Sequence, residues 1–303
     1  MTPLILFVHR RPKHTRMTLD ALRANTLASE TPLFIYSDAA RDSKEQVLVN
    51  EVRTSLRNQL GFKEVNVIER PHNFGLANNI IDGVTDVIER YGKVIVLEDD
   101  MVTSPYFLQY MNDALAFYQD DLNVASIHGY CYPTPQELPE TFFLRGADCW
   151  GWATWQRAWQ YFEADGLKLL RELKARQLTY AFDFDGSYPY TAMLKKQVRG
   201  KNNSWAIRWY ASAFLRNMLT LYPGQSLVRN IGHDASGVHC EASNNYDVVF
   251  PPQNVCIKRQ EIVECAVARN AFVDYFRSIQ TTFPERVISY LRRQWQRLIK
   301  RYH

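Results

Sequence analysis

Three adjacent acids, Glu98, Asp99 and Asp100, follow directly on a short apolar run and are the residues best suited to chemistry. The run at 94–97 is β-branched and has no polar face, which is typical of a fully buried parallel strand. Neighbouring carboxylates repel one another unless a cation lies between them, and a divalent metal is the usual solution. An acidic turn that caps a helix starting near Ser104 is the structural alternative. The pattern favours a metal site that holds a diphosphate.

Strand-like and helix-like segments alternate ahead of these acids. Apolar strand patterns occur at 4–8, 32–36, 65–68 and 94–97, with helical patterns between them. This alternation predicts an α/β fold with a doubly wound, mostly parallel sheet. A polar or charged residue follows each strand: Arg10, Asp38, Arg70 and Asp100. Because open α/β sheets bind ligands at the carboxyl ends of their strands, we expect a nucleotide at this common edge.

Composition is that of a globular protein. The chain has 303 residues, of which 46% are hydrophobic and 22% charged. A net charge of +4 is too mild to imply a nucleic-acid partner, and we expect none. No apolar run approaches the ~20 residues of a membrane span, and the first residues lack the pattern of a signal peptide. Five cysteines without Cys-x-x-Cys spacing favour a reducing compartment, so we expect a cytoplasmic protein.

The order of these motifs resembles the nucleotide-sugar glycosyltransferases of the A-type fold. Within that class it is most similar to the N-acetylglucosaminyltransferase I-like enzymes and their bacterial relatives in polysaccharide assembly. The resemblance implies a Rossmann-like catalytic domain with a C-terminal helical extension. Residues 1–103 would form its nucleotide-sugar-binding half, 104–252 its acceptor-side half, and 253–303 the extension. The matching residues are the acidic triplet, Arg10, Asp38, the Gly-Trp element at 150–155 and a late Gly-x-His that ends at His239.

The resemblance also implies a role for each matching residue. Asp100 would bind Mn²⁺ or Mg²⁺ directly, and His239 would complete the metal or diphosphate site. The implied donor contacts are Arg10 as a nucleotide-side cation, Asp38 as the base-reading acid, Asn73, Glu98 at the sugar, Asp99 at the ribose or diphosphate, and Trp152.

Trp and Tyr become frequent in the second half of the chain, and their rings suit both core packing and stacking on sugars. Packing is the expected role of most of them, including Trp155 and Trp159, which lie four apart on a predicted helix. Trp150 and Trp152 differ, because Gly151 between them permits a tight turn. Such a turn lies beside the donor sugar in the resembling family. We therefore predict a functional role for Trp152 and leave Trp150 open.

An inverting transferase also needs a carboxylate that takes the proton of the acceptor hydroxyl. In the resembling enzymes this acid lies in a Trp-Asp-Asp-Trp element, whereas the local equivalent at 204–209 contains no acid. We predict that Asp185 is the base, with Asp148 and Asp183 as alternatives. A turn that holds its own backbone is the structural explanation for Asp185. Arg208 is predicted to neutralise the leaving diphosphate.

The chain after 251–252 has a helical pattern to its end. The segment 286–301 carries six basic residues, no acid and apolar residues at helical spacing. Such a helix either packs on the catalytic domain or lies on an anionic membrane surface. Peripheral attachment at the inner face of the membrane therefore stays open.

The leading hypothesis is a metal-dependent, inverting glycosyltransferase. It would move a sugar from a UDP-sugar such as UDP-GlcNAc to a saccharide or lipid-linked saccharide acceptor in surface polysaccharide or glycan assembly. A nucleotidyltransferase is one alternative, although the segment 9–12 lacks the Gly-rich, Lys-bearing loop of that class. A catalytically silent carbohydrate-binding scaffold is the other, because the segment 204–209 has no acid.

Overall fold

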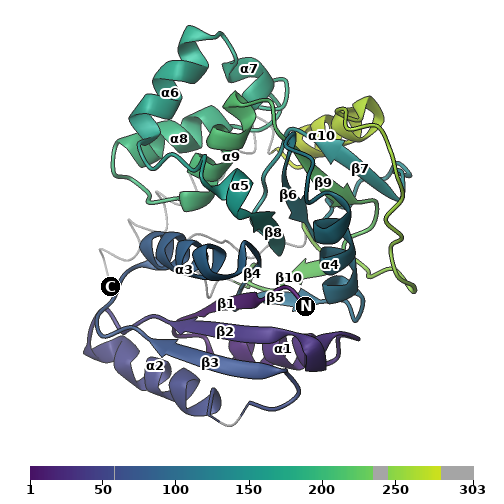
Figure 1. The fold of residues 1–303 in the computed structure, drawn as a ribbon. Coiled ribbons are helices and arrows are strands. Elements are labelled where there is room, and N and C mark those ends of the chain that lie inside the picture. Colours follow the sequence, from purple (N-terminus) through teal and green to yellow (C-terminus); the bar gives the residue numbers. More distant parts are fainter. Residues whose placement is uncertain (58, 235–244, 281–303) are drawn as a thin grey trace, which may run out of the picture.

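The structure is a computed structural model, and it describes residues 1–57, 59–234 and 245–280 (Figure 1). The predicted ligand His239 and the predicted basic helix at 286–301 lie outside the described residues.

An eight-stranded sheet forms the centre of the molecule, in the order β3-β2-β1-β4-β8-β6-β9-β7. Pairings between β1, β2, β3 and β4 are parallel, as is the pairing of β6 with β9. Only β8 and β7 run against their neighbours in this sheet. The predicted mostly parallel α/β sheet is therefore confirmed. The strands are β1 (Leu4–Val8), β2 (Pro32–Ser37), β3 (Glu64–Glu69), β4 (Lys93–Glu98), β6 (Val124–His128), β7 (Thr141–Leu144), β8 (Trp152–Trp155) and β9 (Leu219–Pro223).

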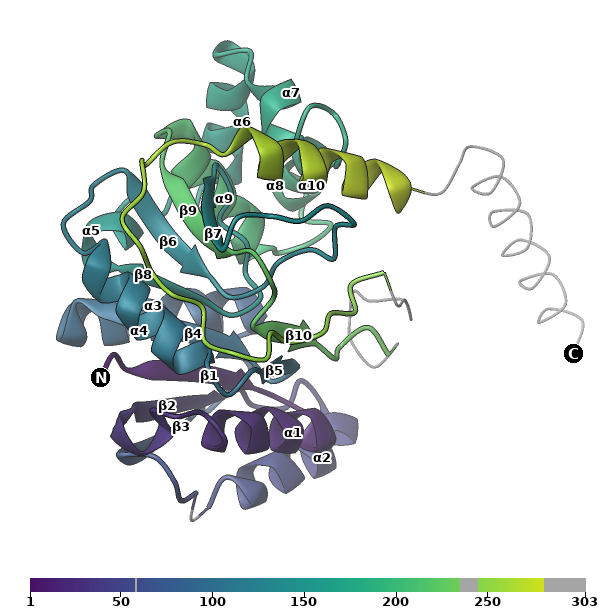
Figure 2. The same cartoon turned by 90° about the vertical axis from the view of Figure 1, so that its right-hand side faces the viewer.

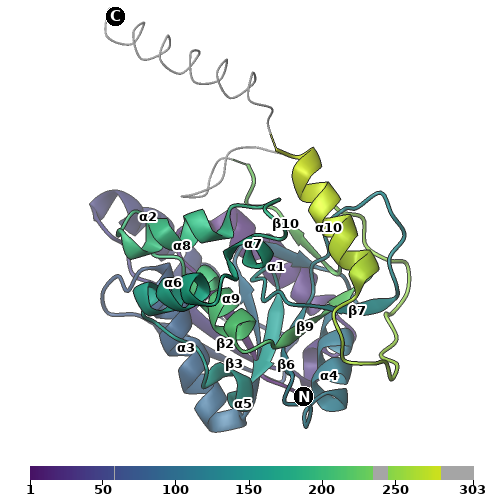
Figure 3. The same ribbon diagram turned by 90° about the horizontal axis from the view of Figure 1, so that it is seen from above.

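Helices cover both faces of this sheet, as Figures 1 and 3 show. Alternate side chains of a strand point to opposite faces, so Leu4 and Leu6 join one buried cluster while Ile5 and Phe7 join the other. The first cluster is closed by α1 (Pro12–Arg23), α2 (Ser43–Ser55) and α4 (Phe107–Phe117). The second cluster is closed by α3 (Leu76–Tyr91), α9 (Trp205–Leu215) and α10 (Ala266–Ser278).

A helical lobe is inserted between β8 and β9, and it occupies the top of Figure 1. Its longest helix, α9, begins at Ser204, whose hydroxyl accepts a hydrogen bond from Ile207 N (3.3 Å) as a helix cap. Because the lobe lies between β8 and β9, the central sheet fixes both of its ends. The remaining helices are η1 (Ala28–Glu30), which precedes β2, and α5 (Gln156–Trp159), α6 (Gly166–Ala175), α7 (Thr179–Phe182) and α8 (Tyr190–Val198) of the lobe.

A second, two-stranded sheet pairs β5 (Met101–Thr103) with β10 (Val228–Asn230) in antiparallel register. The two strands lie side by side in Figure 2, at the carboxyl edge of the central sheet. Ile231 N donates a hydrogen bond to Asp100 O (2.9 Å) just beyond this pairing. The small sheet therefore brings a distant part of the chain, 231–234, to the acidic triplet.

The described part of the C-terminal extension packs on the central sheet. Phe272 of α10 lies 5.9 Å from the Phe142 ring of β7, and Cys265 N donates to Phe143 O (2.8 Å). Among the described residues, no helix combines the length and the apolar character that a bilayer span requires. The domain boundaries at 103 and 252 stay predictions, since one sheet draws strands from both proposed halves.

Candidate functional site

The acidic triplet lies where β1, β2 and β4 end side by side, as predicted from the strand pattern. The cation among these carboxylates is Arg11, the residue before α1. Its Nη1 lies 2.9 Å from Asp100 Oδ2, and its Nη2 hydrogen-bonds Asp99 Oδ1. Burial alone lowers the pKa of Arg11, but Asp99 and Asp100 together raise it above its ordinary value. The guanidinium therefore stays charged between the two acids.

Arg11 does not fully compensate the triplet. Burial, followed by the charges of Asp100 and Asp99, raises the pKa of Glu98 to about 8 although Arg11 lowers it. Burial likewise raises the pKa of Asp99, against the opposing effect of Arg11. The site consequently retains a proton near neutral pH, and a further cation would favour its release.

Asp100 has one oxygen for which the described structure provides no partner. Its Oδ1 is buried and accepts no hydrogen bond within those residues, which is a costly state for a carboxylate oxygen. On the other oxygen, a Cβ at Gly232 would lie 2.2 Å from Asp100 Oδ2, so only glycine fits there. His233 Nε2 is also buried without a partner in the described ranges, and burial lowers the pKa of this histidine. The histidine predicted for this site from the sequence was His239, which lies outside the described residues.

The donor atoms fit a divalent metal that shares its coordination with a ligand. No cluster of three His, Cys, Asp or Glu side chains placed for a metal occurs in the described part of the chain. Mg²⁺ and Mn²⁺ commonly take only one or two carboxylates from the protein, with phosphate oxygens and water completing the shell. The free Asp100 oxygen meets that smaller requirement, whereas a metal held by protein alone would need more ligands.

Asp38 and Asn73 are brought together, but the Asp38 carboxylate is already occupied. It accepts hydrogen bonds from Ala39 N (2.9 Å), Phe74 N (2.8 Å), Gly75 N (3.0 Å) and Asn73 Nδ2 (3.2 Å). Four bonds use the acceptor sites of a carboxylate, so this side chain fixes the loop before α3. Its role in reading a base stays a prediction.

Arg10 points away from the triplet that Arg11 contacts. Its Nε lies 3.3 Å from Glu45 Oε1 of α2, and Arg41 pairs with the same carboxylate. Its role toward the nucleotide also stays a prediction. The adjacent Arg11 is the residue that sequence reasoning missed.

Of the two tryptophans around Gly151, Trp150 rather than Trp152 borders the site. Trp152 is 1% exposed and packs at 5.3 Å on Trp205 within the core, so its ring is not available to a donor sugar. Trp150 instead lies 5.3 Å from the ring of His233 and 4.8 Å from that of Tyr130. Trp150 N also donates to Nε2 of His128 (3.2 Å).

Asp185 and Arg208 both have structural partners. Asp185 is paired with Arg269 Nη2 of α10 at 2.9 Å, in a turn where its φ is 56°. Arg208 donates from its guanidinium to Ser204 O (3.1 Å), Ala164 O (3.2 Å) and Asn203 Oδ1 (3.2 Å). The Asp185 pair joins the helical lobe to α10, whereas the Arg208 contacts lie within the lobe. Neither residue has a described contact with the triplet. Their catalytic roles stay predictions without structural support.

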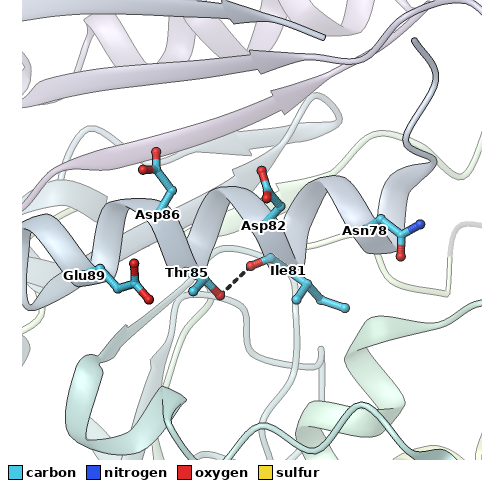
Figure 4. A pocket seen from close by; sticks show the side chains of 6 residues that line it. All are labelled: Asn78, Ile81, Asp82, Thr85, Asp86 and Glu89. Atoms are coloured by element: carbon cyan, nitrogen blue, oxygen red, sulfur yellow. Dashed lines mark hydrogen bonds between the residues drawn. The ribbon is translucent and has the colours of Figure 1, made fainter. Parts of the chain in front are cut away.

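A separate open groove follows the outer face of α3, and Figure 4 shows its acidic side chains in a row. Arg70 pairs with Asp82 and Arg90 with Asp86 (2.6 Å), so arginines already compensate these acids. The groove is distinct from the carboxyl edge of the sheet, and we assign it no function. Its lining residues are Asn78, Ile81, Asp82, Thr85, Asp86 and Glu89.

No protein-family model and no curated protein matches the chain. Solved structures show distant likeness. Residues 1–349 of TarS from S. aureus are 12% identical over 74% of this chain and 60% of that chain, with a TM-score of 0.39. The mannosyltransferase PcManGT from Pyrobaculum calidifontis, solved with GDP-Man and Mn²⁺, is 12% identical over 70% and 73%, with a TM-score of 0.38. A UDP-glucose pyrophosphorylase complexed with UDP-glucose is 11% identical over 74% and 90%, with a TM-score of 0.37. The chain spans only 25% of the longer S. aureus TarS chain it matches.

Proposed function

We propose that this protein is a glycosyltransferase that takes a sugar from a nucleotide-sugar donor, with UDP-GlcNAc as the first donor to test. The observation that carries the proposal is the buried acidic triplet at the carboxyl edge of the sheet, with an Asp100 oxygen that lacks a partner among the described residues. A buried carboxylate oxygen with unmet bonding capacity is expected where a ligand completes the site.

The donor diphosphate would lie between Arg11 and Asp100. A guanidinium binds phosphate oxygens through its paired N–H groups, and Arg11 is the charged group nearest the triplet in the described structure. Mn²⁺ or Mg²⁺, when bound at Asp100, would neutralise charge on the leaving diphosphate. The loop that Asp38 fixes before α3 would support the nucleoside, and Trp150 would border the sugar.

The acceptor is proposed to be a saccharide, free or lipid-linked, as in surface polysaccharide assembly. Its hydroxyl would attack the anomeric carbon from the face opposite the diphosphate, which inverts the configuration. Attack requires a carboxylate to receive the hydroxyl proton. The support for this part is the sequence resemblance and the edge position of Trp150, because aromatic rings suit the C–H faces of sugars.

A nucleotidyltransferase is the second candidate, because it also places acids after a buried strand to bind Mg²⁺. Such an enzyme needs a flexible phosphate-binding loop after its first strand. Here Arg11 is fixed by two acids and followed directly by helix α1, which begins at Pro12. The geometry therefore favours sugar transfer.

Calorimetric titration of UDP with and without Mn²⁺ tests the proposal. We expect UDP to bind only with Mn²⁺, and Mn²⁺ alone to bind weakly, because the protein supplies few of its ligands. GDP and ADP serve as controls for the base. Absence of binding by UDP, GDP and ADP alike in the presence of Mn²⁺ would reject the proposed function, whereas binding of GDP or ADP alone would change only the donor. Pyrophosphate release from UTP and a sugar 1-phosphate would instead establish the nucleotidyltransferase.

A further inference from the structure

Asp148 lies at the same edge as the acidic triplet, in the segment between β7 and β8. Because β8 runs opposite to β4, the chain reaches the carboxyl end of β4 just before β8 begins. Burial, and then the carboxylates of Glu98, Asp148 and Asp100, raise the pKa of the neighbouring Cys149 thiol. The acids that affect this thiol therefore come from two directions along the chain, because Glu98 and Asp100 lie where β4 ends whereas Asp148 precedes β8.

Asp148 is held by hydroxyl groups and not by a cation. Tyr222 OH of β9 donates to its Oδ2 at 2.8 Å, and the Tyr132 hydroxyl is a second partner. Burial raises the pKa of Asp148 to about 6, although these two hydrogen bonds lower it. No described Lys, Arg or His contributes to this shift. Asp148 is thus ionised at neutral pH but binds a proton more readily than an ordinary aspartate.

The other two acids considered as the base are committed to local structure. Asp185 forms its ion pair with Arg269 (2.9 Å). Asp183 Oδ1 accepts a hydrogen bond from Thr191 N (2.5 Å) in the first turn of α8. A carboxylate paired with a cation is a weaker base, and one that holds a helix end is not free to approach a substrate. Asp148 pairs with no cation in the described part of the chain and holds no helix end; its described partners are two tyrosine hydroxyls.

We infer that Asp148 is the carboxylate that takes the proton of the acceptor hydroxyl, an inference that rests on the proposed function. The acceptor oxygen forms a bond to the anomeric carbon of the donor while the bond from that carbon to the diphosphate oxygen breaks. The electron pair of the broken bond leaves with the diphosphate, and the hydroxyl proton passes to Asp148. A general base works best when its pKa lies near the working pH, which the buried position of Asp148 favours.

The tyrosines and cysteines that interact with Asp148 ionise at much higher pH than Asp148 does. Burial raises the pKa of each well above neutrality, so none of them titrates near pH 6. Glu98, which also acts on Cys149, has its pKa raised to about 8 by burial and by Asp100 and Asp99, so it titrates at higher pH than Asp148. The base form of Asp148 is lost as the pH falls through its pKa. The reaction rate should therefore fall on the acid side with that pKa. The main tyrosines and cysteines are Tyr130, Cys131, Tyr132, Cys149, Tyr190 and Tyr222.

Asp148→Asn tests the inference, because an amide oxygen still accepts the Tyr222 hydrogen bond but takes no proton. UDP release from UDP-GlcNAc and other common UDP-sugars is measured with Mn²⁺ across pH, with water as the acceptor. We expect release to fall by roughly 10²- to 10⁴-fold, UDP affinity to stay unchanged and the acid limb of the pH profile to disappear. Tyr222→Phe, which keeps the carboxylate, should retain that limb with a shifted midpoint.

Two results separate the failure of this inference from that of the proposed function. If the wild-type protein binds none of UDP, GDP and ADP with Mn²⁺, the proposed function is rejected and Asp148 loses its role with it. If the wild-type protein releases UDP and Asp148→Asn releases it equally fast, only the inference is overturned. A large loss in Asp185→Asn with normal release in Asp148→Asn would restore Asp185 as the base.

Discussion

Two clusters of this molecule each contain one arginine and two acids but differ in how fully their polar atoms are paired. In the first, Arg11 contacts Asp99 and Asp100 at the carboxyl edge of the sheet. In the second, Arg269 contacts Asp185 (2.9 Å) and Glu264 (3.3 Å) where α10 meets the helical lobe. Each arginine bridges two acids and is mostly buried, since 20% of the Arg11 side chain and 12% of the Arg269 side chain are exposed.

The clusters differ in whether all their buried polar atoms have a hydrogen-bond partner among the described residues. At Arg11 one carboxylate oxygen is buried without a partner among the described residues, and the pKa of Glu98 is raised. At Arg269 the guanidinium also donates to Ala181 O (3.2 Å), and the turn it supports holds Phe184 at a φ of 47°. A satisfied pair stabilises a strained turn, whereas an unsatisfied group at a sheet edge is prepared for a ligand.

Removing Asp100 should give the largest effect and separate the two clusters. Asp100→Ala deletes the triplet oxygen that is buried without a hydrogen-bond partner among the described residues. Loss of a direct metal ligand is expected to weaken Mn²⁺-dependent UDP binding by about 100-fold or more, while the melting temperature changes little. Calorimetry measures the affinity and circular dichroism the fold. Asp185→Ala is the matched control and should bind UDP normally. Equal losses of UDP affinity in both variants would contradict the assignment of a binding role to the Arg11 cluster alone.

Removing Arg269 should give the opposite result, a loss of stability without a loss of binding. Arg269→Ala leaves Asp185 and Glu264 without their shared cation and frees the strained turn. Hydrogen bonds to charged groups contribute about 2 kcal/mol each, so we expect the free energy of unfolding to fall by about that amount or more. Urea denaturation measures the change. A variant of unchanged stability, or one with weakened UDP binding, would contradict the structural role of this cluster.

The smallest expected effect is that of replacing Arg11 on the binding of Mn²⁺ alone, and it sharpens the comparison. In Arg11→Gln the triplet loses its built-in cation, so a divalent metal meets less competition for the same carboxylates. Water and salt screen this repulsion at a partly exposed site, and without Arg11 the acids bind protons more readily, so we expect a gain in Mn²⁺ affinity of roughly tenfold or less. We therefore expect Mn²⁺ alone to bind more tightly and to raise the melting temperature more than in the wild type. Identical Mn²⁺ affinities would mean that Arg11 and the metal do not share a site.

Much of this architecture follows from local sequence patterns. The first four predicted strands match β1 to β4 within about one residue at each end, because apolar runs bounded by charge define buried strands. The approach of Asp38 to Asn73 follows from parallel strands that end at one edge. The acidic triplet was located for the same reason.

Some site residues could not be predicted from the sequence, because backbone direction and long-range pairing determine where their side chains lie. Arg10 and Arg11 are equivalent in sequence, and only the entry into α1 decides which one faces the acids. Trp150 and Trp152 would share a face in a regular strand. Gly151, at a φ of 69°, turns the chain so that they pack against opposite clusters. The partner of Asp185 lies 84 positions away, beyond the reach of any local pattern.

Because β8 runs antiparallel to β4 and β6, two separate sets of chain segments reach the site. Loops that leave β1, β2 and β4 carry the proposed donor contacts, whereas the segment that carries Asp148 and Trp150 arrives from β7 and enters β8. That segment is fixed at both ends by strands, so its residues other than Asp148 and Trp150 can change without moving the acids after β4. Exchanging it between proteins that share this sheet order would alter acceptor choice while retaining the donor. The fold thus permits one half of the reaction to evolve, or be engineered, while the other half stays constant.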